Sequence, residues 1–256
     1  MCNVSNLNLS STVYLAFKRT LDVTVSLLVL LLLLPILLPI SILLRLTAEG
    51  EVFYFQKRVG HHNQPFDIWK FATMLKNSPN MGTGTLTLRK DPRVTSVGRF
   101  LRKSKINELP QVVNVLLGNM SLVGPRPQVK ADFLAYPAPI QKVIYNAKPG
   151  ITGIGSIIFR DEEILLSSTT MPPHDFYREH IAPYKGELEL WYQRNASLRT
   201  DLLIIFLTAW VIFFPANHLA FRIFKDLPLG TEELLPGKAT PSKLEVAIQE
   251  QLAAKE

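Results

Sequence analysis

Residues 104–127 read Ser-Lys-Ile-Asn-Glu-Leu-Pro-Gln-Val-Val-Asn-Val-Leu-Leu-Gly-Asn-Met-Ser-Leu-Val-Gly-Pro-Arg-Pro. This stretch contains the most informative local patterns of the chain. Its first apolar residues recur with helical spacing, at Leu109, Val112, Val113 and Leu116. Asn107 is a favoured N-cap residue, Pro110 is tolerated in a first turn, and Gly118 can end the helix. The pattern therefore predicts a short helix that starts at Asn107 and stops at Gly118.

The same stretch places a carboxylate, backbone amides and a fixed cation close together in sequence. Glu108 would lie in the first helical turn, where unpaired N–H groups and the helix dipole favour negative groups, phosphate included. Residues 120–123 predict a short buried strand or extended run, and the two prolines after it hold Arg126 in a stiff loop. Such a combination suits phosphoryl transfer.

At these residues the chain resembles a known family, the small monotopic bacterial phosphoglycosyl transferases, or bacterial sugar transferases, which act on polyprenyl phosphates. The family pattern is an Asp-Glu pair, then Leu-Pro-Gln, then Asn-Val-Leu-x-Gly-x-Met-Ser-x-Val-Gly-Pro-Arg-Pro. The chain carries all of this pattern except the Asp, which is replaced by Asn107. The resemblance covers roughly residues 14–215, and its motifs are specific.

Asn107 is the main departure from the family. There the Asp is taken to attack the β-phosphate of the donor and to form a phosphosugar–enzyme intermediate. A neutral amide is a poor nucleophile, so three outcomes stay open. Glu108 takes over as nucleophile or metal ligand; or transfer is direct, with Glu108 holding Mg²⁺ or acting as base; or the protein keeps the fold and binding without the chemistry. Asn and Asp are nearly interchangeable as N-caps, so the change is expected to preserve the fold.

The composition indicates one domain with an anionic partner. A chain of 256 residues, 47% of them hydrophobic, is long enough for one domain with a sizeable core. The single cysteine, Cys2, excludes a disulfide framework. The net charge of +7 points to anionic lipid, nucleic acid or a nucleotide. Because the sequence contains no nucleic-acid-binding motif, nucleic acid is not expected as a partner.

Residues 23–44 form an uncharged, Leu-rich segment of about 22 residues, near the length needed to span a bilayer. A transmembrane helix or an ordinary signal anchor would explain this length. Two features favour a segment that enters the membrane and returns. Pro35 and Pro39 remove helical hydrogen bonds in its middle and invite a kink. Basic residues, which mark the cytoplasmic side, flank both ends, at Lys18, Arg19, Arg45, Lys57 and Arg58. The resemblance implies the same re-entrant helix, with its break at Pro35.

Two further segments match the family and predict the surroundings of the site. Residues 53–60 and 66–71 alternate like strands around a loop, which predicts a β-hairpin. In the family's Lys-Phe-Arg-Thr-Met element that follows, Ala72 replaces the usual Arg or Lys. Residues 91–103 form a basic segment with an apolar edge. This segment indicates either a face on anionic lipid headgroups or a phosphate site that includes Arg102.

Two smaller features complete the prediction of local structure. Asp22, at the mouth of the apolar segment, is expected to pair with Lys18 or Arg19 one helical turn away. Residues 202–214 are apolar but too few to span a bilayer, so they predict a buried or interfacial helix.

The predicted fold is α+β and mostly helical. A re-entrant membrane helix at the N-terminus, amphipathic interfacial helices and a small β-hairpin are expected to surround the active site. We expect a flexible N-terminus over residues 1–16 and the re-entrant helix over residues 17–46. A catalytic domain over residues 47–225 would lie on the cytosolic face of the membrane, followed by a mobile tail over residues 226–256.

The resemblance implies transfer of a sugar-1-phosphate from a nucleotide diphosphosugar, with UDP as the expected nucleotide, to polyprenyl (undecaprenyl) phosphate. This would be the first membrane step of surface polysaccharide synthesis, at the cytosolic face of the bacterial inner membrane. Membrane lipids are expected partners, and a homodimer is left open. The alternative is a catalytically impaired family member that acts as a membrane-bound scaffold.

The expected site has one catalytic carboxylate among cations. Glu108, with Asn107 beside it, is the predicted catalytic residue and the predicted ligand of Mg²⁺. The predicted phosphate contacts are Arg102, Arg126, Lys70 and Arg58.

Overall fold

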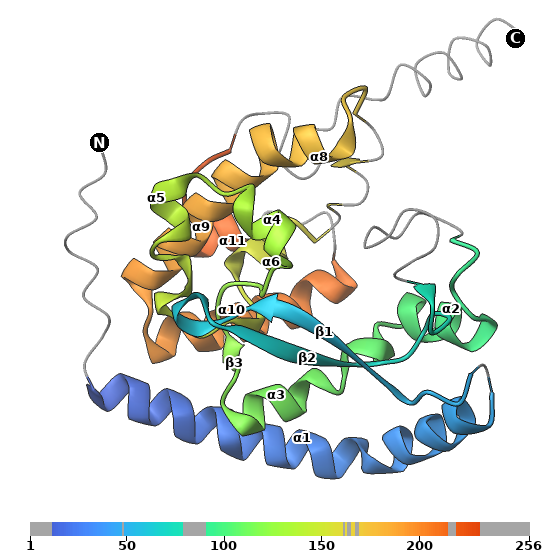
Figure 1. Cartoon of the computed structure of the whole chain (residues 1–256). Coiled ribbons are helices and arrows are strands. Elements are labelled where there is room, and N and C mark those ends of the chain that lie inside the picture. The colour runs from blue at the N-terminus through green and yellow to red at the C-terminus, as the bar shows by residue number, and fades with distance from the viewer. Residues whose placement is uncertain are drawn as a thin grey trace, which may run out of the picture.

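The chain folds into a mostly helical body that lies along one side of a single long helix. The computed structural model describes residues 12–47, 49–78, 91–160, 162, 165–166, 169–214 and 219–230. Figure 1 shows the long helix α1 (Thr12–Leu46) beneath a small antiparallel sheet, with other helices above the sheet. The prediction of a mostly helical fold with an apolar N-terminal helix and a β-hairpin is confirmed.

Helix α1 is continuous over 35 residues and contains Pro35 and Pro39. In Figure 1 it is bowed rather than folded back on itself. It begins at Thr12, so residues 12–16, expected to be flexible, are helical; residues 1–11 lie outside the described part of the chain. Among the described residues, α1 is the one helix long and apolar enough to cross a membrane, and only 6% of its apolar window is buried. A re-entrant course through the bilayer stays a prediction.

Asp22 fixes the N-terminal half of α1 to the body. Its Oδ1 accepts hydrogen bonds from Ser121 Oγ at 3.1 Å and from the backbone N–H of Leu122 at 2.9 Å. The predicted direct pairing of Asp22 with Lys18 or Arg19 is not found among the ion pairs of the described residues, and the charge of Lys18 acts on Asp22 only from a longer distance. The two cations have closer partners on other helices. The Asp22 carboxylate is instead hydrogen-bonded to Ser121 and Leu122, which belong to a strand.

Lys18 and Arg19 bind two different elements. The Lys18 ammonium lies 2.6 Å from the buried carboxylate of Asp201, at the start of α10 (Leu198–Phe213). Arg19 donates to the carbonyl oxygens of Val115 and Leu116 at 2.7 and 2.8 Å. These carbonyls belong to the last turn of α3 (Gln111–Leu117), where a cation offsets the negative end of the helix dipole.

The C-terminal half of α1 is held by apolar contacts. Leu44 is fully buried and packs with Phe71 and Leu101 in a small cluster. Both ends of α1 therefore contact the same body, whereas Leu31 and Leu32 in its middle are 68% and 74% exposed.

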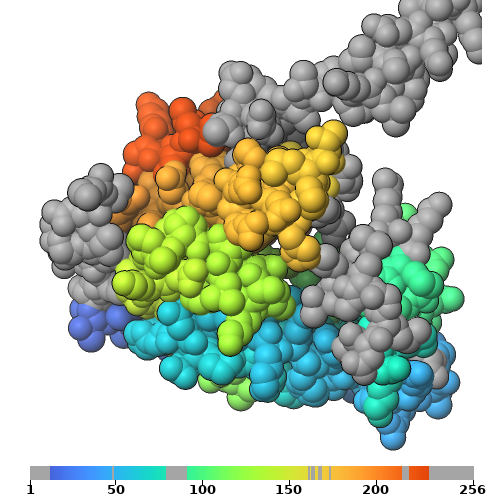
Figure 2. All heavy atoms as spheres, turned by 45° about the horizontal axis from the view of Figure 1, so that its top comes forward, coloured from blue at the N-terminus to red at the C-terminus, as the bar shows by residue number. Residues whose placement is uncertain are grey.

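The predicted β-hairpin is confirmed. Strand β1 (Phe53–Val59) pairs antiparallel with β2 (Pro65–Phe71), and the register sets Tyr54 opposite Lys70. Because successive side chains alternate between faces, Phe53 and Phe55 lie on the face opposite Tyr54. Figure 2 shows the hairpin against the segment that carries α4 (Lys130–Leu134) and α5 (Ala138–Gln141).

The start of the predicted helix at Asn107 is wrong. Ile106–Glu108 form a 3-10 turn, in which Asn107 is buried, and α3 begins only at Gln111 with Pro110 at the N-cap position. The hydrogen bonds of this segment run from residue i+3 to i, for example from Glu108 N to Lys105 O at 3.1 Å. The reason is Pro110, which has no N–H to donate to the carbonyl an α-helix would require. The predicted stop at Gly118 is confirmed by its left-handed φ of 88°.

A second, parallel pair of strands joins the segment before Pro125 to the segment after Pro149. Strand β3 (Ser121–Val123), predicted from sequence, pairs with β4 (Gly150–Thr152). The backbones that continue from these strands are in contact, because a Cβ on Gly150 would collide with the backbone of Gly124. Glycine is therefore required where the two loops cross.

The remaining helices form the main core above the sheet. They are η5 (Ile144–Asn146), α6 (Ile154–Ile158), α8 (Pro173–Phe176), η6 (Tyr177–Ile181), α9 (Ala182–Asn195) and α11 (Leu219–Ile223). Helix α2 (Ser96–Lys103) lies apart from them and packs through Leu101 on the cluster of Leu44 and Phe71. The core packs residues of α9 and α10 such as Leu188, Tyr192 and Leu207 against α6. Trp191 of α9 donates to Asp226 at 2.9 Å, so the described start of the predicted mobile tail is attached; residues 231–256 lie outside the described part.

Candidate active site

Three of the predicted site residues meet at one ion-paired carboxylate. The ammonium of Lys70, on β2, lies 3.4 Å from Glu108 Oε1, in the 3-10 turn before α3. Arg126 Nη2, from the loop after β3, lies 3.7 Å from the same oxygen. The Glu108 side chain keeps 27% of its surface exposed, so it is accessible rather than turned into the apolar core.

The loop that carries Arg126 is held in place by two prolines and by Tyr145. Pro125 and Pro127 restrict its backbone, and the hydroxyl of Tyr145 donates to the carbonyl of Arg126 at 2.9 Å. The same hydroxyl accepts the backbone N–H of Gln128, also at 2.9 Å. The Arg126 side chain is 41% exposed, so a rigid backbone presents a reachable guanidinium.

Lys70 is placed by the attachment of β2 to α3. The side chain of Asn114, fully buried in α3, donates to the carbonyl of Asp67 at 2.8 Å and accepts the N–H of Trp69 at 2.9 Å. The side-chain amide of Asn114 thus makes the hydrogen bonds that a neighbouring strand would make with this edge of β2. The 3-10 turn with Glu108 directly precedes α3, so this contact sets the distance between Lys70 and Glu108.

Arg58 lies next to this group on β1. Its guanidinium donates to Gln56 Oε1 at 2.7 Å and to the carbonyl of Pro127 at 3.2 Å. Its Nε is buried and has no hydrogen-bond partner among the described residues. Burial, and then the charge of Arg126, lower the pKa of Arg58. An anion at this position would relieve that repulsion.

The charges around Glu108 fix its protonation state. Burial alone would raise the pKa of Glu108, but the nearby charges of Arg126, Lys70 and Lys105 outweigh it and hold the pKa below its ordinary value. Burial, opposed by Glu108, lowers the pKa of Lys70 to about 8. At neutral pH the carboxylate is therefore ionised and Lys70 carries its charge.

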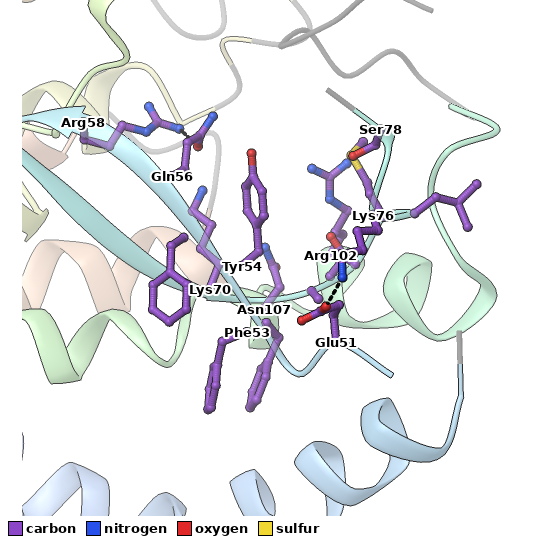
Figure 3. A pocket seen from close by; sticks show the side chains of 16 residues that line it. Glu51, Phe53, Tyr54, Gln56, Arg58, Lys70, Lys76, Ser78, Arg102 and Asn107 are labelled. Carbon is purple, nitrogen blue, oxygen red and sulfur yellow. Dashed lines mark hydrogen bonds and ion pairs between the residues drawn. The ribbon is translucent and has the colours of Figure 1, made fainter. Parts of the chain in front are cut away.

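A pocket of about 390 Å³ opens beside this ion pair, between the hairpin and the segment that follows it (Figure 3). Arg58 and Lys70 line it from the hairpin, and Arg102 and Asn107 line it from α2 and the 3-10 turn. The structure thus brings the six predicted residues to two adjoining places. Glu108 is ion-paired with Lys70 and Arg126. Arg102, Asn107, Arg58 and Lys70 line the pocket, so Lys70 belongs to both places.

Asn107 and Glu108 are the residues that fit a divalent metal. The amide oxygen Oδ1 of Asn107 is buried and has no hydrogen-bond partner among the described residues. With the Glu108 carboxylate it offers two hard oxygen ligands, the kind that Mg²⁺ prefers. The described residues contain no group of three or more His, Cys, Asp or Glu side chains able to hold a metal by themselves. These two residues therefore fit a Mg²⁺ ion only if phosphate oxygens of a substrate complete its shell.

Several residues that shape the site have no role predicted from the sequence: Tyr54, Gln56, Lys105, Asn114 and Tyr145. Asn114 stands inside the family-like motif, so the motif itself was a signal for it. Tyr145 lies far along the chain from Arg126, and no local pattern connects the two.

Comparisons with known proteins show the family of the chain. Residues 13–215 match the family described as "Bacterial sugar transferase". The chain belongs to this family. Among its relatives is the UDP-glucose:undecaprenyl-phosphate glucose-1-phosphate transferase of Escherichia coli K12, 36% identical over 196 residues, which cover 75% of this chain and 39% of the relative.

Two further relatives show how much of the known proteins the chain spans. The UDP-N-acetylgalactosamine-undecaprenyl-phosphate N-acetylgalactosaminephosphotransferase of Aeromonas hydrophila is 34% identical over 202 residues, 78% of this chain and 44% of the relative. The exopolysaccharide production protein ExoY of Sinorhizobium fredii is 32% identical over 205 residues, 75% of this chain and 83% of the relative. The chain thus spans less than half of the first two relatives and most of the third.

Proposed function

We propose that this bacterial sugar transferase moves a sugar-1-phosphate from a UDP-sugar to undecaprenyl phosphate, as the first membrane step of a surface glycan. The observation that carries the proposal is the ionised Glu108 carboxylate, held between Lys70 and Arg126 at the edge of a cation-lined pocket. Phosphoryl transfer depends on positioning and on stabilisation of phosphate charge, which such a group of cations provides. The names of the Escherichia coli and Aeromonas hydrophila relatives state the same acceptor and the same class of donor.

The proposed location is the cytosolic face of the inner membrane, with α1 as a re-entrant helix. Both ends of α1 are attached to one body, through Asp22 at one end and Leu44 at the other, which supports entry and exit on the same side. Its exposed middle, around Leu31 and Leu32, would contact lipid.

Helix α10 supports the same placement. Its inner face, with Ile204 and Leu207 fully buried, packs on the core. Its outer face exposes Leu202, Phe206 and Phe213, the last to 76%. A helix with one apolar face in the core and another exposed is suited to the membrane interface. We therefore include α10 among the interfacial elements.

The proposed mechanism assigns the displacement to Glu108. An oxygen of its carboxylate attacks the β-phosphorus of the UDP-sugar, and the bond between that phosphorus and the bridging oxygen breaks to release UMP. The phosphosugar is then held on Glu108. An oxygen of undecaprenyl phosphate attacks the same phosphorus, the bond to Glu108 breaks, and the carboxylate is restored. Its low pKa supports this role, because the group is ionised without a base to deprotonate it.

The other residues act on charge and position. Lys70, Arg58 and Arg126 would neutralise the phosphate oxygens, and Arg102 would contact the donor from the far side of the pocket. Glu108 and Asn107 would hold a Mg²⁺ ion, which would supply further charge neutralisation. Asn107, neutral at the place of the family's Asp, would orient the donor through its amide.

The second candidate function is a membrane-bound scaffold, and Asn107 is the observation that favours it. The two functions are separated by incubating the full-length protein in lipid nanodiscs with a panel of nucleotide diphosphosugars and measuring nucleotide monophosphate release. Turnover with a UDP-sugar in the presence of undecaprenyl phosphate supports the transferase. Absence of release with every donor, from protein that is folded, favours the scaffold.

A donor labelled in its β-phosphate separates the two transferase mechanisms. Without acceptor, wild-type protein is expected to retain label after denaturation, because the phosphosugar is bonded to Glu108. Turnover with no retained label would indicate direct transfer, with Glu108 as base or metal ligand.

A further inference from the structure

We propose that the exposed ring of Tyr54 is the stacking platform for the planar base of the nucleotide donor. The inference rests on the proposed function and goes beyond it, because it assigns one part of the pocket to the nucleoside and so fixes how the donor enters.

Tyr54 differs from the other aromatic residues of the hairpin. The rings of Phe53 and Phe55 pack against Trp69 at centroid distances of 5.5 and 5.0 Å, on the face opposite Tyr54. Within the part of the chain that the structure describes, the Tyr54 ring contacts no other aromatic ring. Tyr54 is 42% exposed and lines the pocket on the same face of β1 as Gln56 and Arg58, while Phe53, Phe55 and Phe71 add apolar surface to the lining. An exposed aromatic ring on the same face as cationic and amide side chains is suited to a planar ligand that carries charged groups.

The position of Tyr54 within the pocket matches the shape of a nucleoside diphosphate. Figure 3 shows its ring standing between Lys70 and Arg58 on one side and Lys76 and Ser78 on the other. Lys70 is directly opposite Tyr54 in the strand register. A diphosphate bound by Lys70 and Arg58 therefore leaves the attached nucleoside within reach of the Tyr54 ring.

The lining beyond Tyr54 is also suited to a base. Thr73 and Ser78 line the pocket there and offer hydroxyl groups that can donate or accept hydrogen bonds, while Met74 offers an adaptable apolar surface. The occupant that fits this end is a flat, polar, aromatic ring, such as a pyrimidine.

The test measures binding of three probes to full-length protein in nanodiscs, by calorimetry: UDP, inorganic pyrophosphate and a UDP-sugar. Base–aromatic stacking is typically strong enough that Tyr54→Ala should weaken UDP binding on the order of tenfold. Tyr54→Phe, which keeps the ring, should bind UDP as wild type does. Pyrophosphate should bind equally to all three proteins, because the cations are unchanged. Lys57→Ala is the matched control, since Lys57 lies on the opposite face of β1 and is 76% exposed.

The role of Tyr54 and the proposed transfer are tested by different outcomes. Unchanged UDP binding by Tyr54→Ala overturns the stacking role of Tyr54, even if wild-type protein turns over a UDP-sugar. Weaker binding of the UDP-sugar with unchanged binding of UDP also overturns it, because the ring would then contact the sugar. A wild-type protein that binds UDP but releases no UMP contradicts the proposed transfer, and the effect of Tyr54→Ala on UDP still decides the role of the ring.

Discussion

The ammonium of Lys70 lies 3.4 Å from the Oε1 of Glu108, so the second strand of the hairpin and the 3-10 turn before α3 meet at one ion pair. The ion pair changes the pKa of both partners. The lysine and Arg126 keep the carboxylate ionised, and burial brings the pKa of Lys70 to about 8. The pair is also partly exposed, so a substrate phosphate can compete with Glu108 for Lys70.

The first prediction concerns the pH dependence of kcat/KM, which reports groups of the free enzyme. Lys70 is charged below its pKa of about 8 and loses the charge above it, so kcat/KM should fall as pH rises through about 8. Glu108, with its pKa below the ordinary value, should remain ionised across the neutral range. Lys70→Arg should remove the alkaline decline, because arginine stays charged. A decline at the same pH in Lys70→Arg would assign it to another group.

The second prediction concerns the attachment of α1. Asp201 is 2% exposed and binds Lys18 at 2.6 Å and the hydroxyl of Tyr192 at 2.7 Å. Asp201→Asn leaves the largely buried Lys18 without its counter-charge and should destabilise the protein by about 3 kcal/mol. Asp67→Asn is the control, because the Lys57–Asp67 pair is exposed and should contribute less than about 1 kcal/mol. Thermal unfolding in nanodiscs measures both, and equal shifts for the two variants would contradict the expectation.

The third prediction concerns topology. Cys2 is the single cysteine of the chain, so it reports one end of α1 without engineering. If α1 is re-entrant, a membrane-impermeant maleimide added outside intact cells should leave Cys2 unlabelled and should label it after permeabilisation. A Lys57→Cys variant on a Cys2→Ser background marks the side of the catalytic body. Labelling of Cys2 from outside, with position 57 protected, would indicate a spanning helix.

The fourth prediction concerns the departure from the family. Asn107→Asp changes an amide to a carboxylate of the same shape, next to Glu108 and in a pocket lined by cations. The variant should keep the fold, and UMP release should rise at least about tenfold, because a carboxylate is the better nucleophile and metal ligand. Release rates and far-UV circular dichroism check the two parts. A folded variant with a lower rate would show that the neutral Asn107 is required.

The sequence predicted the elements whose signals are local. The alternation of residues 53–60 and 66–71 predicted the hairpin, and Gly118 predicted the end of α3. The start of that helix was misplaced, because the capping preference of Asn107 was weighed above the missing N–H of Pro110.

The site depended on contacts that local patterns do not specify. The motifs predicted which residues gather, but the distance between Lys70 and Glu108 is set by Asn114, which bridges β2 and α3. Asp22 was assigned a helical neighbour, whereas its partner is a strand distant in sequence. In each case a buried polar side chain satisfies backbone groups of another element, and only the tertiary fold determines which one.

The most direct test of the account is the rate of UMP release by Glu108→Gln in nanodiscs, with a UDP-sugar that the wild type turns over. The substitution keeps the shape of the side chain and removes its charge, so the rate should fall about a thousandfold while UDP still binds through the remaining cations. Asp67→Asn, which also removes one carboxylate, should release UMP at the wild-type rate. If Glu108→Gln releases UMP within about twofold of wild type, Glu108 does not carry the reaction.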